Sequence, residues 1–160
     1  MMERVNKIKS HPLFLWHMER NSASEADRQF CKHDLAHALD VARIAYMINL
    51  EDTLNLPKER IYAAALLHDI TKWKQYKDGT PHNESAIEPA VQIMLDCGFS
   101  DREIASICNA IFQHRSPPED AAPFSQLLFR ADKLSRACYA CTVSADCNWD
   151  DARKNQLLSH

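Results

Sequence analysis

Glycine is almost absent from this chain of 160 residues, which contains only Gly79 and Gly98. Hairpin turns and phosphate-cradling loops depend on glycine, so we expect neither a hairpin-rich β fold nor a Gly-rich nucleotide loop. The chain also has no run of about 18 apolar residues that would cross a membrane. Its first residues lack the apolar stretch of a secretory signal. These absences predict a cytoplasmic protein without a membrane span.

A strong charge of one sign is missing too. The chain has 19 Lys and Arg against 22 Asp and Glu, a formal net charge of -3. No global positive field attracts a nucleic acid polymer or an anionic membrane, so any anion site must be local. The length and the 46% hydrophobic share predict one domain over residues 1–160. We place its core at about 27–137, followed by a cysteine-bearing tail at 138–160.

Apolar residues recur at helical spacing throughout the chain, and no convincing alternation of period two occurs. This pattern predicts an all-α protein, a single helical bundle of about six to seven helices. Helix signals include Pro57, the Ser100–Glu103 capping box and the stop at Pro117. The expected helices span about 12–20, 27–50, 57–69, 83–97, 101–114 and 123–138, with a break at 21–24 and a loop at 76–81.

An adjacent His68-Asp69 pair closes the apolar run Ala63–Leu67. Two ionisable side chains are costly to bury at this position unless something compensates the cost. Imidazole and carboxylate are both common metal ligands, and a divalent cation offsets buried negative charge. The pair therefore predicts a metal site completed by other helices.

The remaining candidate ligands are His37, His82, His114 and Asp132, each at the end or on one face of a different expected helix. Helical bundles build dinuclear sites from such inward-facing ligands. We therefore expect these side chains to hold one or two ions. Helix capping is the alternative for His82 and His114. His33, one turn before His37, is expected to support a ligand.

Three stretches of this chain resemble the HD superfamily of metal-dependent phosphohydrolases. They are residues 37–43, 66–72 and 130–134, which carry the pattern His, His-Asp and a distant Asp. The resemblance runs from Cys31 to Arg136. It implies a helical fold and a metal site on His37, His68, Asp69 and Asp132. It also implies His82 and His114 as extra ligands, and if they bind a second ion, Asp69 is the expected bridge. In layout the chain is similar to dinuclear members that cut diadenosine tetraphosphate symmetrically.

The predicted function is metal-dependent hydrolysis of a phosphate ester or anhydride, with a small nucleotide as the expected substrate. His68, Asp69 and Lys72 are the predicted catalytic residues. The ion would lower the pKa of bound water toward about 7 and polarise a phosphoryl oxygen. Iron or manganese suits these ligands better than magnesium. The residues predicted to bind phosphate are Lys72, Arg115, Lys133 and Arg136.

Two other functions stay open at this point. One is a regulatory HD module that binds nucleotide or metal without turnover. The other is an HD-type oxygenase with a mixed-valent diiron centre. The oligomeric state is not predicted from the sequence.

Cysteines concentrate after the last expected helix. Cys138, Cys141 and Cys147 have a Cys-x2-Cys-x5-Cys spacing that suits a soft metal or an iron-sulfur cluster. Cys31 is the candidate fourth ligand if its helix packs near the tail. Zinc and an iron-sulfur cluster are both open, and unliganded thiols are the alternative. The family resemblance does not account for these residues.

Overall fold

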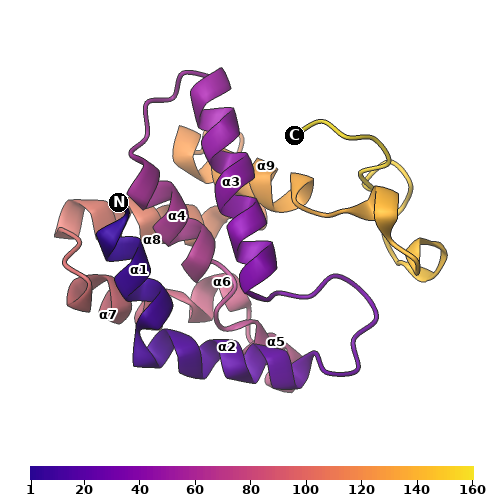
Figure 1. Ribbon diagram of the computed structural model, residues 1–160, viewed down its shortest axis with the longest axis horizontal. Coiled ribbons are helices and arrows are strands. Elements are labelled where there is room, and N and C mark those ends of the chain that lie inside the picture. Colours follow the sequence, from indigo (N-terminus) through magenta and orange to yellow (C-terminus); the bar gives the residue numbers. More distant parts are fainter.

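The computed structural model describes residues 1–160 and consists of helices joined by loops, without a strand. Seven of the nine α-helices have eight or more residues, and the all-α bundle is confirmed. The helices are α1 Glu3–Ser10, α2 Pro12–Ser24, α3 Leu35–Glu51, α4 Lys58–Leu67, α5 Lys72–Asp78, α6 His82–Ser85, α7 Ile87–Asp96, α8 Asp101–Gln113 and α9 Pro123–Leu134 (Figure 1).

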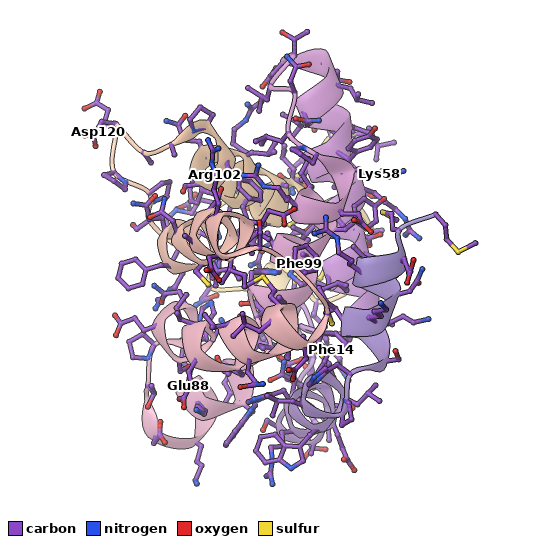
Figure 2. All side chains as sticks on the ribbon, turned by 90° about the vertical axis from the view of Figure 1, so that its left-hand side faces the viewer. Phe14, Lys58, Glu88, Phe99, Arg102 and Asp120 are labelled. Carbon is purple, nitrogen blue, oxygen red and sulfur yellow. The ribbon has the colours of Figure 1, made fainter.

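Helix α4 lies at the centre of the bundle. Every residue of its last turn and a half, Ala63–Leu67, is buried, because α4 packs against α1, α3 and α8 at once. A helix that is apolar on all sides must be enclosed in this way. Apolar side chains such as Phe14 and Phe99 lie among the helices, whereas Glu88 and Asp120 point outward (Figure 2). The apolar run therefore delivers its end, His68-Asp69, into the core.

Two expected boundaries near the N-terminal half are wrong. The break expected at residues 21–24 is helical. Asn21 is buried and its side chain bonds to the backbone of Asp69 and Trp73 instead of ending α2. The long helix expected from Asp27 begins only at Leu35. The Asp34 side chain accepts the backbone N–H of His37 at 2.9 Å and caps α3. Residues 25–34 form the loop that joins α2 to α3.

Other boundaries differ as well. Helix α1 was not expected, although Val5 and Ile8 bury one of its faces. The loop expected at residues 76–81 is helical up to Asp78, where Gly79 takes a left-handed conformation and ends α5. The helix expected over 83–97 is split at Ala86 into α6 and α7.

The chain beyond α9 has little regular structure. Helix α9 ends at Leu134, short of the expected 138, and only the 3-10 turns Cys138–Ala140 and Ser144–Asp146 follow. Asn155 fastens this segment to the end of α9, since its side-chain amide donates to the carbonyls of Lys133, Leu134 and Arg136 at 2.8–3.3 Å. The segment extends away from the helices (Figure 1, yellow). None of the helices has the length and apolar character needed to span a bilayer.

Candidate metal centre

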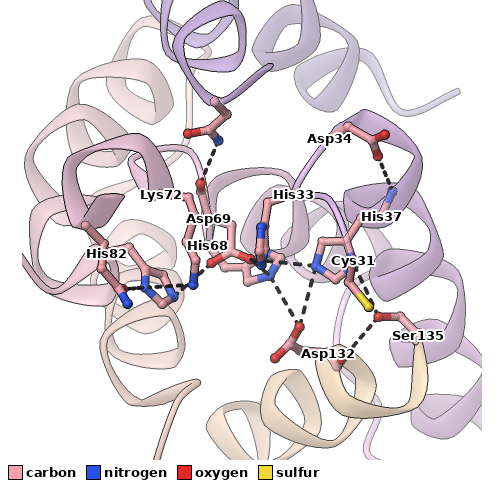
Figure 3. A network of polar contacts seen from close by, with 12 residues as sticks. Cys31, His33, Asp34, His37, His68, Asp69, Lys72, His82, Asp132 and Ser135 are labelled. Atoms are coloured by element: carbon pink, nitrogen blue, oxygen red, sulfur yellow. Dashed lines mark hydrogen bonds and ion pairs between the residues drawn. The ribbon is translucent and has the colours of Figure 1, made fainter. Parts of the chain in front are cut away.

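The six predicted metal ligands meet in the core at the ends of five helices. Figure 3 shows His37, His68, Asp69, His82 and Asp132 pointing toward one another. His37 lies in the first turn of α3, His68 caps α4 with Asp69 directly after it, His82 begins α6, His114 caps α8, and Asp132 lies in the last turn of α9. All are buried except His37, which is almost so. Adjacent side chains within a helix point in different directions and could not share one ion. His68 and Asp69 can do so because they lie at the end of α4.

Four of these residues form one group that could hold an ion: His37, His68, Asp69 and Asp132. The Nε2 atom of His68 lies 3.1 Å from Oδ2 of Asp69, and the Nε2 atom of His37 lies 3.6 Å from the same oxygen. Oδ1 of Asp132 is 3.5 Å from His37 Nε2 and 3.9 Å from His68 Nε2. Two imidazole nitrogens and two carboxylates therefore face a common point.

Asp69, His82 and His114 form a second group on the other side of the Asp69 carboxylate. Oδ1 of Asp69 lies 2.9 Å from His82 Nε2 and 3.7 Å from His114 Nε2. The two Nε2 atoms are 3.1 Å apart. Asp69 thus directs one oxygen toward each group, which is the arrangement required of a bridging ligand.

The histidine rings are held by their Nδ1 atoms. Nδ1 of His68 lies 2.7 Å from the carbonyl of Ala65, and Nδ1 of His114 lies 2.6 Å from that of Ile111. A carbonyl only accepts, so each Nδ1 carries the proton and each Nε2 presents a lone pair to the centre. Each ring also satisfies a carbonyl in the last turn of its own helix.

The remaining two rings have side-chain partners. His37 Nδ1 lies 3.3 Å from the hydroxyl of Ser135, which donates its own proton to the carbonyl of Asp132 and so accepts from the ring. His82 Nδ1 lies 2.5 Å from the side-chain oxygen of Gln75. Ligand histidines are commonly oriented through their second nitrogen in this way.

Buried polar atoms without partners show that a metal ion fits this site. Among the seven buried side-chain polar atoms that make no hydrogen bond, four belong to this centre. They are Nε2 of His37 and His68, Oδ1 of Asp69 and Oδ1 of Asp132. An unsatisfied buried polar group costs roughly 1–3 kcal/mol. A cation at the common point would satisfy the atoms of His37, His68 and Asp132, and a cation in the second group would satisfy Oδ1 of Asp69.

The protonation states agree with a ligand set. Burial would raise the pKa of the Asp69 and Asp132 carboxyls, but the surrounding imidazoles, joined at Asp132 by Lys133, hold both well below their usual range. Burial lowers the pKa of His82 to about 4 despite Asp69. Burial also opposes the charged form of His37, but Asp132 and Asp69 outweigh it and raise its pKa to about 9. At neutral pH the carboxylates are ionised and His82 is neutral, while His37 releases a proton if an ion binds.

A cavity of about 580 Å³ opens over the centre and is rich in cations. The cationic residues lining it are Arg28, Lys72, Arg115, Lys133, Arg136 and Arg153. Lys133 and Arg136 approach Asp132, at 2.5 and 3.5 Å respectively. No carboxylate lies within ion-pair distance of Arg28, Lys72 or Arg115. All four residues predicted to bind phosphate thus face the cavity, together with two that were not foreseen.

Several residues that support the metal centre were not predicted from the sequence. Asn21 donates to the backbone carbonyl of Asp69 and accepts the N–H of Trp73, both at 2.9 Å, so it clamps the His-Asp turn. Glu25 accepts from the backbone and ring of His33, and Tyr76 donates to the same carboxylate at 2.6 Å. His33 in turn points Nε2 toward Asp69, 3.9 Å away. This places His33 beside a candidate ligand, and its supporting role stays a prediction.

The four cysteines predicted as ligands share a different cavity, of about 400 Å³, which has Arg136 in common with the cationic one. It is lined by Cys31, Cys138, Cys141 and Cys147. Their sulfur atoms do not draw together into a group of three within 4.8 Å, and all four thiols are free. Metal binding by these cysteines stays a prediction.

Comparisons with known proteins identify relatives over the same region. The profile of the HD domain family matches residues 34–137. A Clostridium beijerinckii protein, described as an uncharacterized protein, is 46% identical over 154 residues, 96% of this chain and 97% of that protein. The crystal structure of a predicted HD superfamily hydrolase from an uncultured Thermotogales bacterium matches with a TM-score of 0.66 and 23% identity, covering 97% of this chain and 81% of that one. This likeness concerns the fold.

Proposed function

The chain belongs to the HD domain family, and from this premise we propose that it is a metal-dependent phosphohydrolase acting on a small nucleotide. The membership confirms the resemblance drawn from His37, His68-Asp69 and Asp132. The observation that carries the proposal is the cluster of orphaned ligand atoms beneath a cationic cavity.

His37, His68, Asp69 and Asp132 would hold one divalent ion, and His82 and His114 would hold a second with Asp69 between them. When bound, such ions supply an activated water at neutral pH and polarise a phosphoryl oxygen. The histidine-rich donor set favours iron or manganese over magnesium. The protein's own contribution is rigidity, because the Nδ1 partners of the histidines fix the ligand atoms in advance.

The cations of the cavity would bind and orient the phosphate. Lys72 has no carboxylate partner and lies at the start of α5, directly after the His-Asp turn. Burial lowers the pKa of Lys72, although Asp69 and Asp132 oppose this effect. An anionic group would therefore gain both charge pairing and hydrogen bonds from Lys72 and Arg115. Arg136 and Lys133 would extend the contact beside Asp132.

Aromatic residues at the same cavity support a nucleotide. Trp149 and Tyr76 both line it, and the guanidinium of Arg136 lies over the Trp149 ring at 4.5 Å. A flat base stacks well on such surfaces. The volume of about 580 Å³ is in the range of small-molecule sites and matches a mononucleotide better than a polymer.

The direct test is release of phosphate from a panel of nucleoside mono-, di- and triphosphates and dinucleoside polyphosphates. Full-length protein is loaded with iron or manganese, and a chelated sample is the control. Lys72→Gln is compared with Lys74→Gln, which changes the same charge on the same helix outside the cavity. We expect Lys72→Gln to raise KM at least about tenfold and Lys74→Gln to change it little. Equal behaviour of the two variants would contradict the proposal.

The same panel separates the alternatives. A sensor module would retain intact nucleotide, measured by equilibrium binding, and release no phosphate. A diiron oxygenase would consume dioxygen with an organic substrate and leave nucleotides intact. Either result would replace hydrolysis as the function of this centre.

A further inference from the structure

The segment after α9 holds its place without a hydrophobic core. No residue from 133 to 160 is buried, and its only helical elements are two turns of three residues each. Ordering a residue costs about 1–2 kcal/mol in backbone entropy, and apolar burial normally offsets this cost. Asn155 and Lys154 supply some hydrogen bonds. A further crosslink would stabilise a segment of this kind.

Cysteines are the residues positioned to provide that crosslink. Cys138, Cys141 and Cys147 come from the segment, and Cys31 comes from the loop between α2 and α3. Although Cys31 is more than a hundred residues away in the sequence, all four line one cavity of about 400 Å³. The other two cysteines, Cys97 and Cys108, lie in the helical bundle outside it. A centre bound to the four thiols would tie the segment to the α2–α3 loop.

The spacing of the sulfur atoms indicates the kind of centre. A single tetrahedral zinc ion, with bonds of about 2.3 Å, would bring its four sulfurs to about 3.8 Å from one another. Here no three of the sulfurs lie within 4.8 Å of one another, although they surround one space. A cubane iron-sulfur core places metal and sulfide between its ligands and holds the cysteines farther apart. We propose that Cys31, Cys138, Cys141 and Cys147 bind a [4Fe–4S] cluster.

The charges around the cavity suit this cluster. Four thiolates carry more negative charge than the cluster core carries positive charge, so a nearby cation is favourable. Lys154 and Lys32 line the cavity, and so does Arg136. Asp151 raises the pKa of Lys154, and Cys147 and Cys138 act in the same direction. The carboxylates of Asp34 and Asp40 also line the cavity and partly offset these cations.

The proposal is independent of the hydrolase function and is tested on the metals themselves. Full-length untagged protein is purified without oxygen, and iron, zinc and acid-labile sulfide are measured per chain. We expect about four sulfides per chain and a brown colour that bleaches on reduction. The variant Cys141→Ser should lose the sulfide and the colour. Cys108→Ser, which removes a thiol of the helical bundle, should keep both.

A second pair of variants separates the two metal sites. His68→Ala should lose metal from the HD centre and retain the sulfide, while Cys147→Ser should do the opposite. Circular dichroism shows whether each variant keeps its helices. Zinc in place of sulfide, or four thiols that react freely after reconstitution with iron and sulfide, would overturn the cluster. A full content of sulfide in both Cys141→Ser and Cys147→Ser would also overturn it.

Discussion

The HD centre and the cysteine segment place candidate ligands in opposite ways. In the HD centre every ligand lies at or next to the end of a packed helix, and every ring or carboxylate except the His37 ring, which is 10% exposed, is buried. In the segment after Leu134 the donors lie on loops and single turns, and no side chain is buried. The helical bundle sets ligand positions before any ion arrives. A loop segment acquires its order together with its metal.

This difference has an energetic meaning. The helical centre contains buried ligand atoms without hydrogen-bond partners, so an ion that binds there stabilises a structure that already exists. We expect the cysteine segment to have little stability of its own, so that binding of the proposed cluster would fold the segment as well as fill the site. Removing the ion of the HD centre should therefore lower the stability of the whole helical bundle. Removing the proposed cluster should unfold only the segment after Leu134.

The largest effect is expected from Asp69→Asn. This change removes the charge from the one side chain that belongs to both ligand groups. We expect metal content to fall at both positions and kcat/KM to fall by well over about 100-fold, while the helices remain. Elemental analysis, kinetics and circular dichroism measure these outcomes. The control Asp120→Asn removes an exposed charge. Normal turnover by Asp69→Asn would refute the bridging role.

Next in size is the effect of losing the cysteine ligands. In Cys141→Ser, limited proteolysis should cut residues 135–160 about ten times faster, because the segment loses its crosslink. The midpoint of helical unfolding should change little. Chelation of the HD ion in the unaltered chain should do the reverse and lower that midpoint. If both treatments shift the same transition, the two regions are not independent.

Trp149→Ala tests the base-stacking role that we assign to the segment in the hydrolase. Trp149 lines the cationic cavity. A lost stacking contact of about 1–3 kcal/mol corresponds to roughly a tenfold or greater rise in KM, with little change in kcat. The matched control is Tyr139→Ala, since Tyr139 is an exposed aromatic of the same segment outside that cavity. An equal effect of both changes would contradict base stacking.

Glu103→Gln should give the smallest effect, confined to the helical bundle. Arg4 bonds to Glu103 at 3.0–3.1 Å, and with Ser100 it lowers the pKa of this carboxyl from 4.5 to about 2. A lowered folded-state pKa stabilises the fold above about 4.5, and this stability disappears as pH falls toward 2. We expect a loss of about 1 kcal/mol at pH 7.

Urea unfolding at pH 7 and again at pH 3 checks this prediction, because the gap between the two proteins should narrow at the lower pH. Metal content should be unchanged, since Glu103 lies at the start of α8 and His114 at its end. A loss of metal would mean that the Arg4–Glu103 contact at the start of α8 affects the metal centre.

Much of the centre could be predicted because its ligands interrupt apolar patterns. His68-Asp69 ends a buried apolar run, and His114 ends the apolar face of α8. Polar residues at these two positions indicate a site because their burial must be compensated. The all-α class followed from periodicity in the same way. These signals are local, and a single sequence carries them in full.

The supporting residues could not be predicted because their partners are distant in the chain. Asn21 has the composition of a helix breaker, and only the fold shows that it clamps the turn at Asp69. Glu25 and Tyr76 meet at His33 across the α2–α3 loop. Trp149 and Arg153 reach the cavity from a segment without periodicity. Side chains that act through long-range contacts leave no pattern in the neighbouring residues.

The capping histidines of α4 and α8 have a consequence for permitted chain lengths. Each ring is tied to a carbonyl three residues earlier, so its direction depends on where the helix stops. One residue inserted into α4 would turn His68 by about 100° around the helix axis and aim its lone pair at packed aliphatic groups. Lengths should vary freely in the exposed loop at residues 118–120, and hardly at all inside these two helices.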